Sequence, residues 1–253
     1  CAEMGHETYT CSVCGEPKTY DLPLLAHTYD PDGEYEILQE ATETASGVLG
    51  YDCIVCEKEN AIAIEYTLSS EFRDNLEAGG KVEVNKSFIW NDQVWMTDSK
   101  SELILGEDSV LTVEGDGIID LSGNAELVID GKGKLNQTFD SVLGYLVRAA
   151  GNSKVTIKDG HFTAGLTAVQ AGDNAVVEIY FEALATWKDK TWILNLIDDS
   201  NAKIIVYGGT FVNYDPSNSA TENPEMNFVA EGYKVVVTED ATGNKIYTVE
   251  PEE

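Results

Sequence analysis

Residues 101 to 214 repeat one short pattern of polar and apolar positions. Each of five segments opens on Asn or Asp, continues with Ser or Ala, and then alternates apolar with other residues. The segments are DSVLTVEGDGI (108–118), NAELVIDGKGK (124–134), NSKVTIKDGHF (152–162), NAVVEIYFEAL (174–184) and NAKIIVYGGTF (201–211). In alignment, the fourth position is Leu111, Leu127, Val155, Val177 and Ile204, and the sixth is Val113, Ile129, Ile157, Ile179 and Val206. Because residues two apart share a strand face, each segment predicts one strand with these two side chains inward.

The spacing of the segments favours a solenoid. They begin at residues 108, 124, 152, 174 and 201, and unequal spacing suits inner strands in register with outer turns of variable length. A second strand is expected before three of them, at LVRAAG (146–151), AVQAGD (168–173) and ILNLIDD (193–199). We therefore predict an all-β fold, a right-handed parallel β-helix with coils about 4.8 Å apart. An antiparallel β-sandwich would also explain the alternation, but not the shared polar opening.

Sequences typical of caps flank this body. SSEFRDNLEAGG (69–80) predicts an entry helix with Ser69 or Ser70 as N-cap, Phe72 and Leu76 on one face, and Gly79 at its end. YKVVVTEDATGNKIYTV (233–249) predicts a β-hairpin that turns at residues 242–244. We expect a Cys-rich β head over 1–68, the β-helix with its entry helix over 69–214, and a cap loop and hairpin over 215–253.

All five cysteines lie within the first 56 residues, and four of them form two C-x-x-C pairs. Each pair is flanked by expected strands, and a C-x-x-C turn presents two thiolates to one metal ion. Two such turns would complete a zinc-ribbon-like head with a structural zinc ion, whose predicted ligands are Cys11, Cys14, Cys53 and Cys56. Two alternatives stay open: a Cys3His site of Cys1, Cys11, Cys14 and His27, and disulfides that leave one thiol over.

The head resembles a tandem-repeat family of surface proteins from Gram-positive gut bacteria and their phages. The shared pattern is a cysteine, a Thr-Tyr-Thr-Cys-x-x-Cys-Gly motif and a closing His-Thr-Tyr, here CAEMGHETYTCSVCGEPKTYDLPLLAHTYD (1–30). A degenerate second copy over about 37–68 keeps GYDCIVC. It has Glu43 in place of the leading cysteine and no counterpart of His27.

A second resemblance concerns both ends of the predicted β-helix. GGTFVNYDPSNSATENPEMNFVAEGYKVVV (208–237) and FRDNLEAGGKVEVNKSF (72–88) resemble the cap and entry segments of β-helical proteins of gut phages and gut bacterial surfaces. The two resemblances imply display on a virion or a cell surface, and they leave open whether phage or bacterium is the source.

The net charge of the chain limits the classes of partner that it can bind. The formal net charge is −29, which argues against nucleic-acid binding and membrane-surface docking. Arg73 and Arg148 are the only arginines, so clamps for phosphate or carboxylate substrates are scarce. No apolar run is long enough to span a bilayer. Because the chain opens at Cys1, we expect a processed or truncated product or, alternatively, a lipoprotein lipidated at Cys1.

No catalytic constellation stands out. Asp198 and Asp199 are the best adjacent carboxylate pair, but they are expected to form a turn rather than a glycosidase site. His161 beside Gly160 is expected to be a solvated turn residue. DPDGEYE (30–36) lacks the full ligand spacing of a calcium loop and is expected to be a linker. Trp187 and Trp192 suit either the corner of a coil or a sugar platform.

We therefore expect a non-enzymatic structural and adhesive protein, extracellular, on a virion or bacterial surface as a fibre, spike or decoration. Expected partners are other subunits of the same assembly and a host surface glycan or protein, and the chain itself is expected to form a homo-oligomer. The alternative is a carbohydrate-active hydrolase or lyase on a β-helix scaffold.

Overall fold

The computed structural model describes residues 6–21, 26–30, 34–42, 45–68, 70–90, 92–114, 117–137, 144–180, 183–186, 193–219, 222 and 226–252. The chain divides into two compact units, residues 1–66 and 67–253. Each unit is described by itself.

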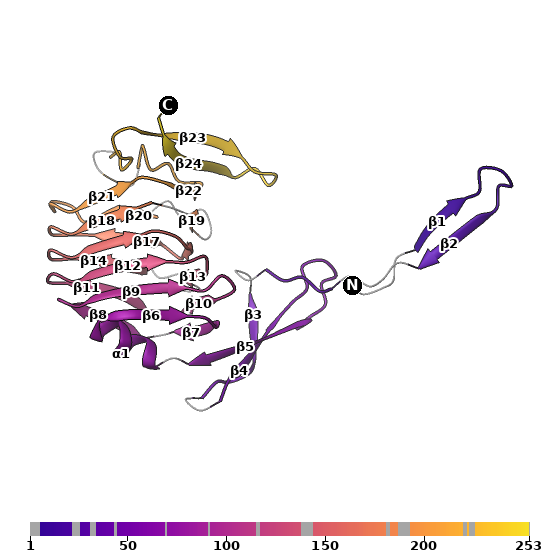
Figure 1. The fold of residues 1–253 in the computed structure, drawn as a ribbon, viewed down its shortest axis with the longest axis horizontal. Helices are drawn as coiled ribbons and strands as arrows, with labels where there is room; N and C mark the ends of the chain where they lie inside the picture. The colour runs from indigo at the N-terminus through magenta and orange to yellow at the C-terminus, as the bar shows by residue number, and fades with distance from the viewer. Residues whose placement is uncertain are drawn as a thin grey trace. The chain divides into compact units, whose positions relative to one another are not determined.

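The second unit is a parallel β-solenoid, as the sequence predicts, and three sheets form its sides (Figure 1). Sheet 1 contains β6 (Gly80–Val84), β9 (Lys100–Leu105), β12 (Glu126–Asp130), β15 (Lys154–Ile157), β18 (Val176–Ile179) and β21 (Lys203–Val206). Sheet 2 contains β8 (Gln93–Thr97), β11 (Ile118–Ser122), β14 (Tyr145–Ala149), β17 (Thr167–Ala171) and β20 (Leu194–Leu196). The parallel part of sheet 3 in the solenoid contains β7 (Phe88–Trp90), β10 (Val110–Val113), β13 (Lys134–Gln137), β16 (His161–Ala164), β19 (Ala183–Thr186) and β22 (Gly209–Val212).

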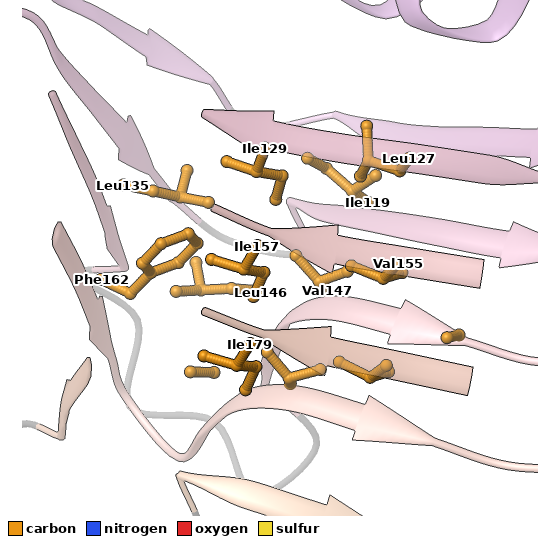
Figure 2. Packing of buried hydrophobic residues seen from close by; sticks show 14 of the residues in the cluster. Ile119, Leu127, Ile129, Leu135, Leu146, Val147, Val155, Ile157, Phe162 and Ile179 are labelled. Atoms are coloured by element: carbon orange, nitrogen blue, oxygen red, sulfur yellow. The ribbon is translucent and has the colours of Figure 1, made fainter. Parts of the chain in front are cut away.

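The core is a set of apolar columns that run from coil to coil. In sheet 1 the register aligns Leu127, Val155, Val177 and Ile204 in one column. A second column contains Ile129, Ile157, Ile179 and Val206. All eight side chains are buried, and Figure 2 shows members of both columns above one another. These two columns confirm the alignment of the last four segments.

The first aligned segment was assigned to the wrong sheet. Leu111 of β10 pairs with Leu135 of β13 in sheet 3, not with Leu127. The error has a physical reason: inward alternation occurs in every sheet, and Asp108-Ser109 has the composition of the polar opening. The residue beside Leu127 in this column is Ser101 of β9, which pairs in turn with Gly80 of β6. The Ser101 hydroxyl donates to the carbonyl of Leu76 at 2.7 Å, so the aliphatic pattern is interrupted there.

The shared polar opening is a ladder of asparagines at the turn between sheets 2 and 1. Asn174 donates its amide to the side-chain oxygen of Asn152 at 3.2 Å, and Asn201 donates to Asn174 at 3.3 Å. Asn124 continues the ladder through Asp98, whose carboxylate accepts from its backbone and side-chain nitrogens. The stacked turns therefore require a short amide or carboxylate at this position.

The predicted entry helix is α1 (Ser70–Ala78). Phe72 and Leu76 are buried against the first coil, where the Phe72 ring packs on Phe88 and Trp90 at 5.3 and 5.4 Å between centroids. Gly79 ends the helix at φ +89°, a conformation that glycine adopts without strain. Ser69, one of the two expected N-caps, lies outside the described residues. Within the part of the chain that the structure describes, no helix is long and apolar enough to cross a bilayer.

The predicted C-terminal hairpin consists of β23 (Tyr233–Glu239) and β24 (Lys245–Pro251). Strand β24 pairs antiparallel with β22, which ends the parallel stacking of sheet 3. Phe228 and Val249 are buried in the same core as the solenoid columns. The solenoid thus has α1 at its first coil and a hairpin at its last.

The first unit contains two antiparallel arrangements. Strands β1 (His6–Thr10) and β2 (Pro17–Asp21) form a hairpin around the first C-x-x-C pair. Strands β3 (Tyr35–Gln39), β4 (Gly47–Tyr51) and β5 (Ile62–Leu68) form a meander around the second. Strand β3 was missed, because residues 30–36 were expected to be a linker.

Truncation of one column member should weaken the whole solenoid. Ile157 is fully buried between Ile129 and Ile179, so Ile157→Ala should lower the free energy of unfolding by about 2–5 kcal/mol. The matched control is Thr156→Ala on the opposite face of the same strand, where we expect a change within about 0.5 kcal/mol. Urea denaturation measures both, and equal losses would contradict the inward assignment.

The exit hairpin should be sensitive to acid through Asp240. Hydrogen bonds from Thr242 and Asn244 hold the pKa of this carboxyl below its usual range. A lowered native pKa stabilises the fold above the pKa of the unfolded chain, and this contribution is lost as the pH falls through the native value. Wild type should therefore be more stable than Asp240→Ala at pH 7, with a difference that shrinks below pH 4. Thermal unfolding between pH 7 and 2 tests this, with the exposed Glu231→Ala as control, and a difference independent of pH would contradict it.

Candidate metal centre

The two C-x-x-C pairs adopt the same backbone turn. In the first, the amide of Cys11 donates to the carbonyl of Glu16 at 2.9 Å, and the amide of Gly15 donates to the carbonyl of Cys11 at 2.8 Å. In the second, the amide of Cys53 donates to the carbonyl of Lys58 at 3.0 Å, and the amide of Glu57 donates to the carbonyl of Cys53 at 2.8 Å. We call residues 11–16 the first knuckle and residues 53–58 the second knuckle.

The residue after each pair has a positive φ. Gly15 has φ 71°, and Glu57 at the equivalent position has φ 56°. A left-handed residue is costly for glutamate and free of cost for glycine. The two knuckles have the same backbone although Glu57 stands where the first knuckle has Gly15. The turn itself, and not its glycine, is therefore their common feature.

His27 joins the second knuckle. Its imidazole and the thiols of Cys53 and Cys56 offer three ligand atoms that lie within 4.8 Å of one another. The distance between His27 Nδ1 and Cys56 Sγ is 3.5 Å. Cys53 is buried, and the other two side chains are half-buried.

Two further contacts hold His27 in this place. The amide of Ile54 donates to the carbonyl of Thr28 at 2.9 Å. The ring of Tyr29 packs on Tyr51, two residues before the knuckle, with centroids 4.8 Å apart. The whole His-Thr-Tyr motif therefore contacts the second knuckle: one residue through its side chain, one through its carbonyl and one through its ring.

The spacing of these atoms fits tetrahedral coordination. With metal–sulfur and metal–nitrogen bonds of about 2.3 and 2.05 Å, neighbouring sulfur and nitrogen ligands lie about 3.6 Å apart. The 3.5 Å between Cys56 Sγ and His27 Nδ1 matches this spacing. Within the described ranges, the group consists of these three residues. The cluster can therefore hold a metal ion and leaves one coordination position for a further donor.

The first thiol of each knuckle has a lowered pKa. Burial would raise the pKa of Cys53, but hydrogen bonds from the backbone of Thr28, from His27 and from the backbone of Cys56 lower it to about 6. Backbone and side-chain hydrogen bonds from Cys14 lower the pKa of Cys11 to about 7. Thiolates are the metal-binding form of cysteine, so these shifts favour metal binding near neutral pH.

The structure brings together part of the predicted ligand set. Cys53 and Cys56 share the cluster with His27, while Cys11 and Cys14 are exposed on the β1–β2 hairpin and are not in it. The site of all four cysteines stays a prediction. In the alternative site with Cys1, Cys11 and Cys14, His27 was expected at the first knuckle, yet it lies at the second, and Cys1 is outside the described residues. The sequence signal for the observed site was the His-Thr-Tyr motif, which was assigned to the preceding cysteines.

The other candidates have plain structural positions. Asp198 and Asp199 form the expected turn, in which Asp199 has φ 59°. His161 begins β16 instead of lying in a turn. Trp187 and Trp192 lie outside the described residues, as does 31–33 of the segment considered for calcium.

One acidic hollow was not foreseen from the sequence. It has a volume of about 350 Å³ and is lined by Glu34, Glu36, Asp52, Glu59 and Asn60, among others. The backbone amide of Asn60 donates to the Asp52 carboxylate at 2.8 Å, and its side-chain amide donates to the Glu36 carboxylate at 2.6 Å. These bonds connect β3 to the loop after β4 beside the second knuckle.

No family model, curated protein or solved structure matches the chain. The interpretation of the metal centre therefore rests on the geometry of His27, Cys53 and Cys56.

Loss of one cluster ligand should release bound metal. We expect purified full-length chain to retain a thiophilic metal ion after dialysis, and His27→Ala to weaken its affinity more than about tenfold. His161→Ala, in the other unit, is the matched control and should leave the affinity unchanged. Metal analysis combined with competition by a chelator measures the effect. Equal affinity in wild type and His27→Ala would contradict the assignment of His27.

Proposed function

We propose that the chain is a non-enzymatic structural and adhesive module, exposed on a virion or a bacterial surface as part of a fibre, spike or decoration. The observation that carries this proposal is the continuous, capped stack of apolar columns. In a solenoid each coil is stabilised by its neighbours, so the stack keeps its form without a ligand. A rigid body of this kind holds outward side chains at fixed spacing.

The outward face of sheet 1 supports a display role. Lys100, Glu126 and Lys154 occupy one register position on three successive strands, so their charges alternate along the stack. Lys100 forms an ion pair with Glu126, and Lys154 pairs with Glu178 at 2.7 Å. Such columns give a repeated polar surface for subunits of the same assembly, including further copies of this chain, or for a host glycan or protein.

Charge and sequence resemblance support an extracellular location. The net charge of −29 keeps a body rich in strand edges from associating nonspecifically. The head and the β-helix caps resemble surface proteins of gut bacteria and phages. Both observations suit a protein that projects into solution and binds through its outer turns.

We further propose that the metal ion of the second knuckle is zinc with a structural role. Two thiolates and one imidazole form a soft donor set that zinc prefers, and zinc adds no redox chemistry. The ion would connect His27 to the loop after β4, which are 26 residues apart along the chain. The small first unit would gain stability that its own core does not supply.

Binding without turnover is the outcome that tests the function. The full chain should bind one or more members of a panel of plant and microbial surface glycans and host surface proteins in a saturable way. It should release no reducing ends and no unsaturated products from the glycans. Lys154→Gln, which removes a charge from the outward face of sheet 1, should change binding, while circular dichroism and melting temperature stay near those of wild type, because an exposed ion pair contributes little to stability. Any catalytic turnover above a protein-free blank would contradict the structural role and favour the carbohydrate-active enzyme.

A further inference from the structure

The two knuckles share a backbone but differ in what covers them. Tyr51, two residues before the second knuckle, is 5% exposed, whereas Tyr9 at the equivalent place before the first is 56% exposed. Cys53 is buried, and Cys11 is exposed. The tips of both knuckles are exposed, Val13 at 93% and Val55 at 62%, so the difference lies at the tyrosine and the first cysteine. The same turn is therefore covered in one copy and open in the other.

The His-Thr-Tyr segment is what covers the second knuckle. His27 places its imidazole 3.5 Å from the thiol of Cys56, Thr28 accepts from the amide of the residue after Cys53, and Tyr29 packs on Tyr51. These three contacts involve three successive residues of an extended segment. The second knuckle thus shows how a knuckle of this type binds such a peptide.

The first knuckle presents the same three groups at the same sequence positions. Cys14 corresponds to Cys56, the amide of Ser12 corresponds to that of Ile54, and Tyr9 corresponds to Tyr51. Among the residues that the structure describes, the amide of Ser12 has no backbone acceptor. The ring of Tyr9 packs edge-on against Tyr20 with centroids 5.9 Å apart and keeps more than half of its surface exposed.

We infer that the first knuckle is a docking site for a His-Thr-Tyr segment presented by a partner polypeptide, which adds a third ligand to a second zinc site at Cys11 and Cys14. The partner's imidazole binds the metal ion, its threonine carbonyl accepts from the amide of Ser12, and its tyrosine packs on Tyr9. The chain has one His-Thr-Tyr sequence, at residues 27–29, and the second knuckle already binds it. The first knuckle therefore needs a segment other than residues 27–29, and we assign this segment to a partner polypeptide.

The chemistry makes this docking conditional on metal. One neutral hydrogen bond and one aromatic contact are together too weak for a stable peptide complex. An imidazole–metal bond adds the main part of the affinity, because zinc favours four donors and the knuckle supplies two. Removal of the metal, of the thiols or of the partner's histidine should each abolish binding.

A labelled peptide tests the inference on the full chain. The probe is Leu-Ala-His-Thr-Tyr-Asp-Pro, the sequence of residues 25–31, and fluorescence anisotropy measures its binding with and without zinc. We expect saturable binding in zinc and none after addition of a chelator. Replacement of the peptide's histidine by alanine should weaken binding at least tenfold, as should the double change Cys11→Ser, Cys14→Ser in the protein.

A second variant keeps the thiols and removes one donor. Ser12→Pro deletes the amide hydrogen at a turn position that accepts proline, so zinc should stay bound while the peptide affinity falls about two- to tenfold. Binding that persists without zinc, or that is unchanged in the double serine variant, would overturn the inference. Zinc-dependent self-association that is lost in His27→Ala would overturn the choice of a different polypeptide and identify a second copy.

The inference rests on the zinc proposed for the second knuckle, and the two can fail separately. The double serine variant keeps His27, Cys53 and Cys56, so its zinc content tests the second knuckle alone. No zinc in this variant would overturn the structural zinc. Zinc there, together with no peptide binding to wild type, would overturn only the docking site.

Discussion

Each coil of the solenoid can bury its apolar residues only against the coils above and below it. The sheet 1 columns from Leu127 to Ile204 and from Ile129 to Val206 satisfy this requirement strand by strand. The requirement also explains the features around the columns. An asparagine ladder keeps the turns in register, and α1 and the β23–β24 hairpin pack against the two end coils, where no further coil supplies apolar contacts.

Much of this architecture could be predicted from alternation and from the shared opening of the segments. Val155, Val177 and Ile204 carry a strong signal, because each is the first inward residue after an Asn-Ser or Asn-Ala turn. Two details could not be predicted. Ser101 occupies an inward position of the same column because it binds the end of α1. Sheet 3 contains buried polar residues such as Asn136 and Gln137, so its strands do not read as regular alternation.

The candidate metal site shows a different limit of sequence reasoning. The knuckles were recognisable because C-x-x-C is a local motif whose turn forms from neighbouring residues. The correct partners of His27 could not be predicted from the sequence, because sequence proximity favoured Cys11 and Cys14 over Cys53 and Cys56. Its true neighbours depend on β3, which brings Tyr35 beside Tyr51 and was not expected as a strand. Long-range partners of a ligand need the tertiary fold.

The central claim is that apolar residues of successive segments stack in one column, and methyl contacts measure this most directly. In the full chain with isotope-labelled methyl groups, we expect nuclear Overhauser effects between Val155 and Val177 and between Val177 and Ile204. We expect none between Val155 and Ile204, which are two coils or about 9.6 Å apart. If Val177 shows no nuclear Overhauser effect to Val155 or to Ile204, the stacked coil is contradicted, and the rigid display role with it.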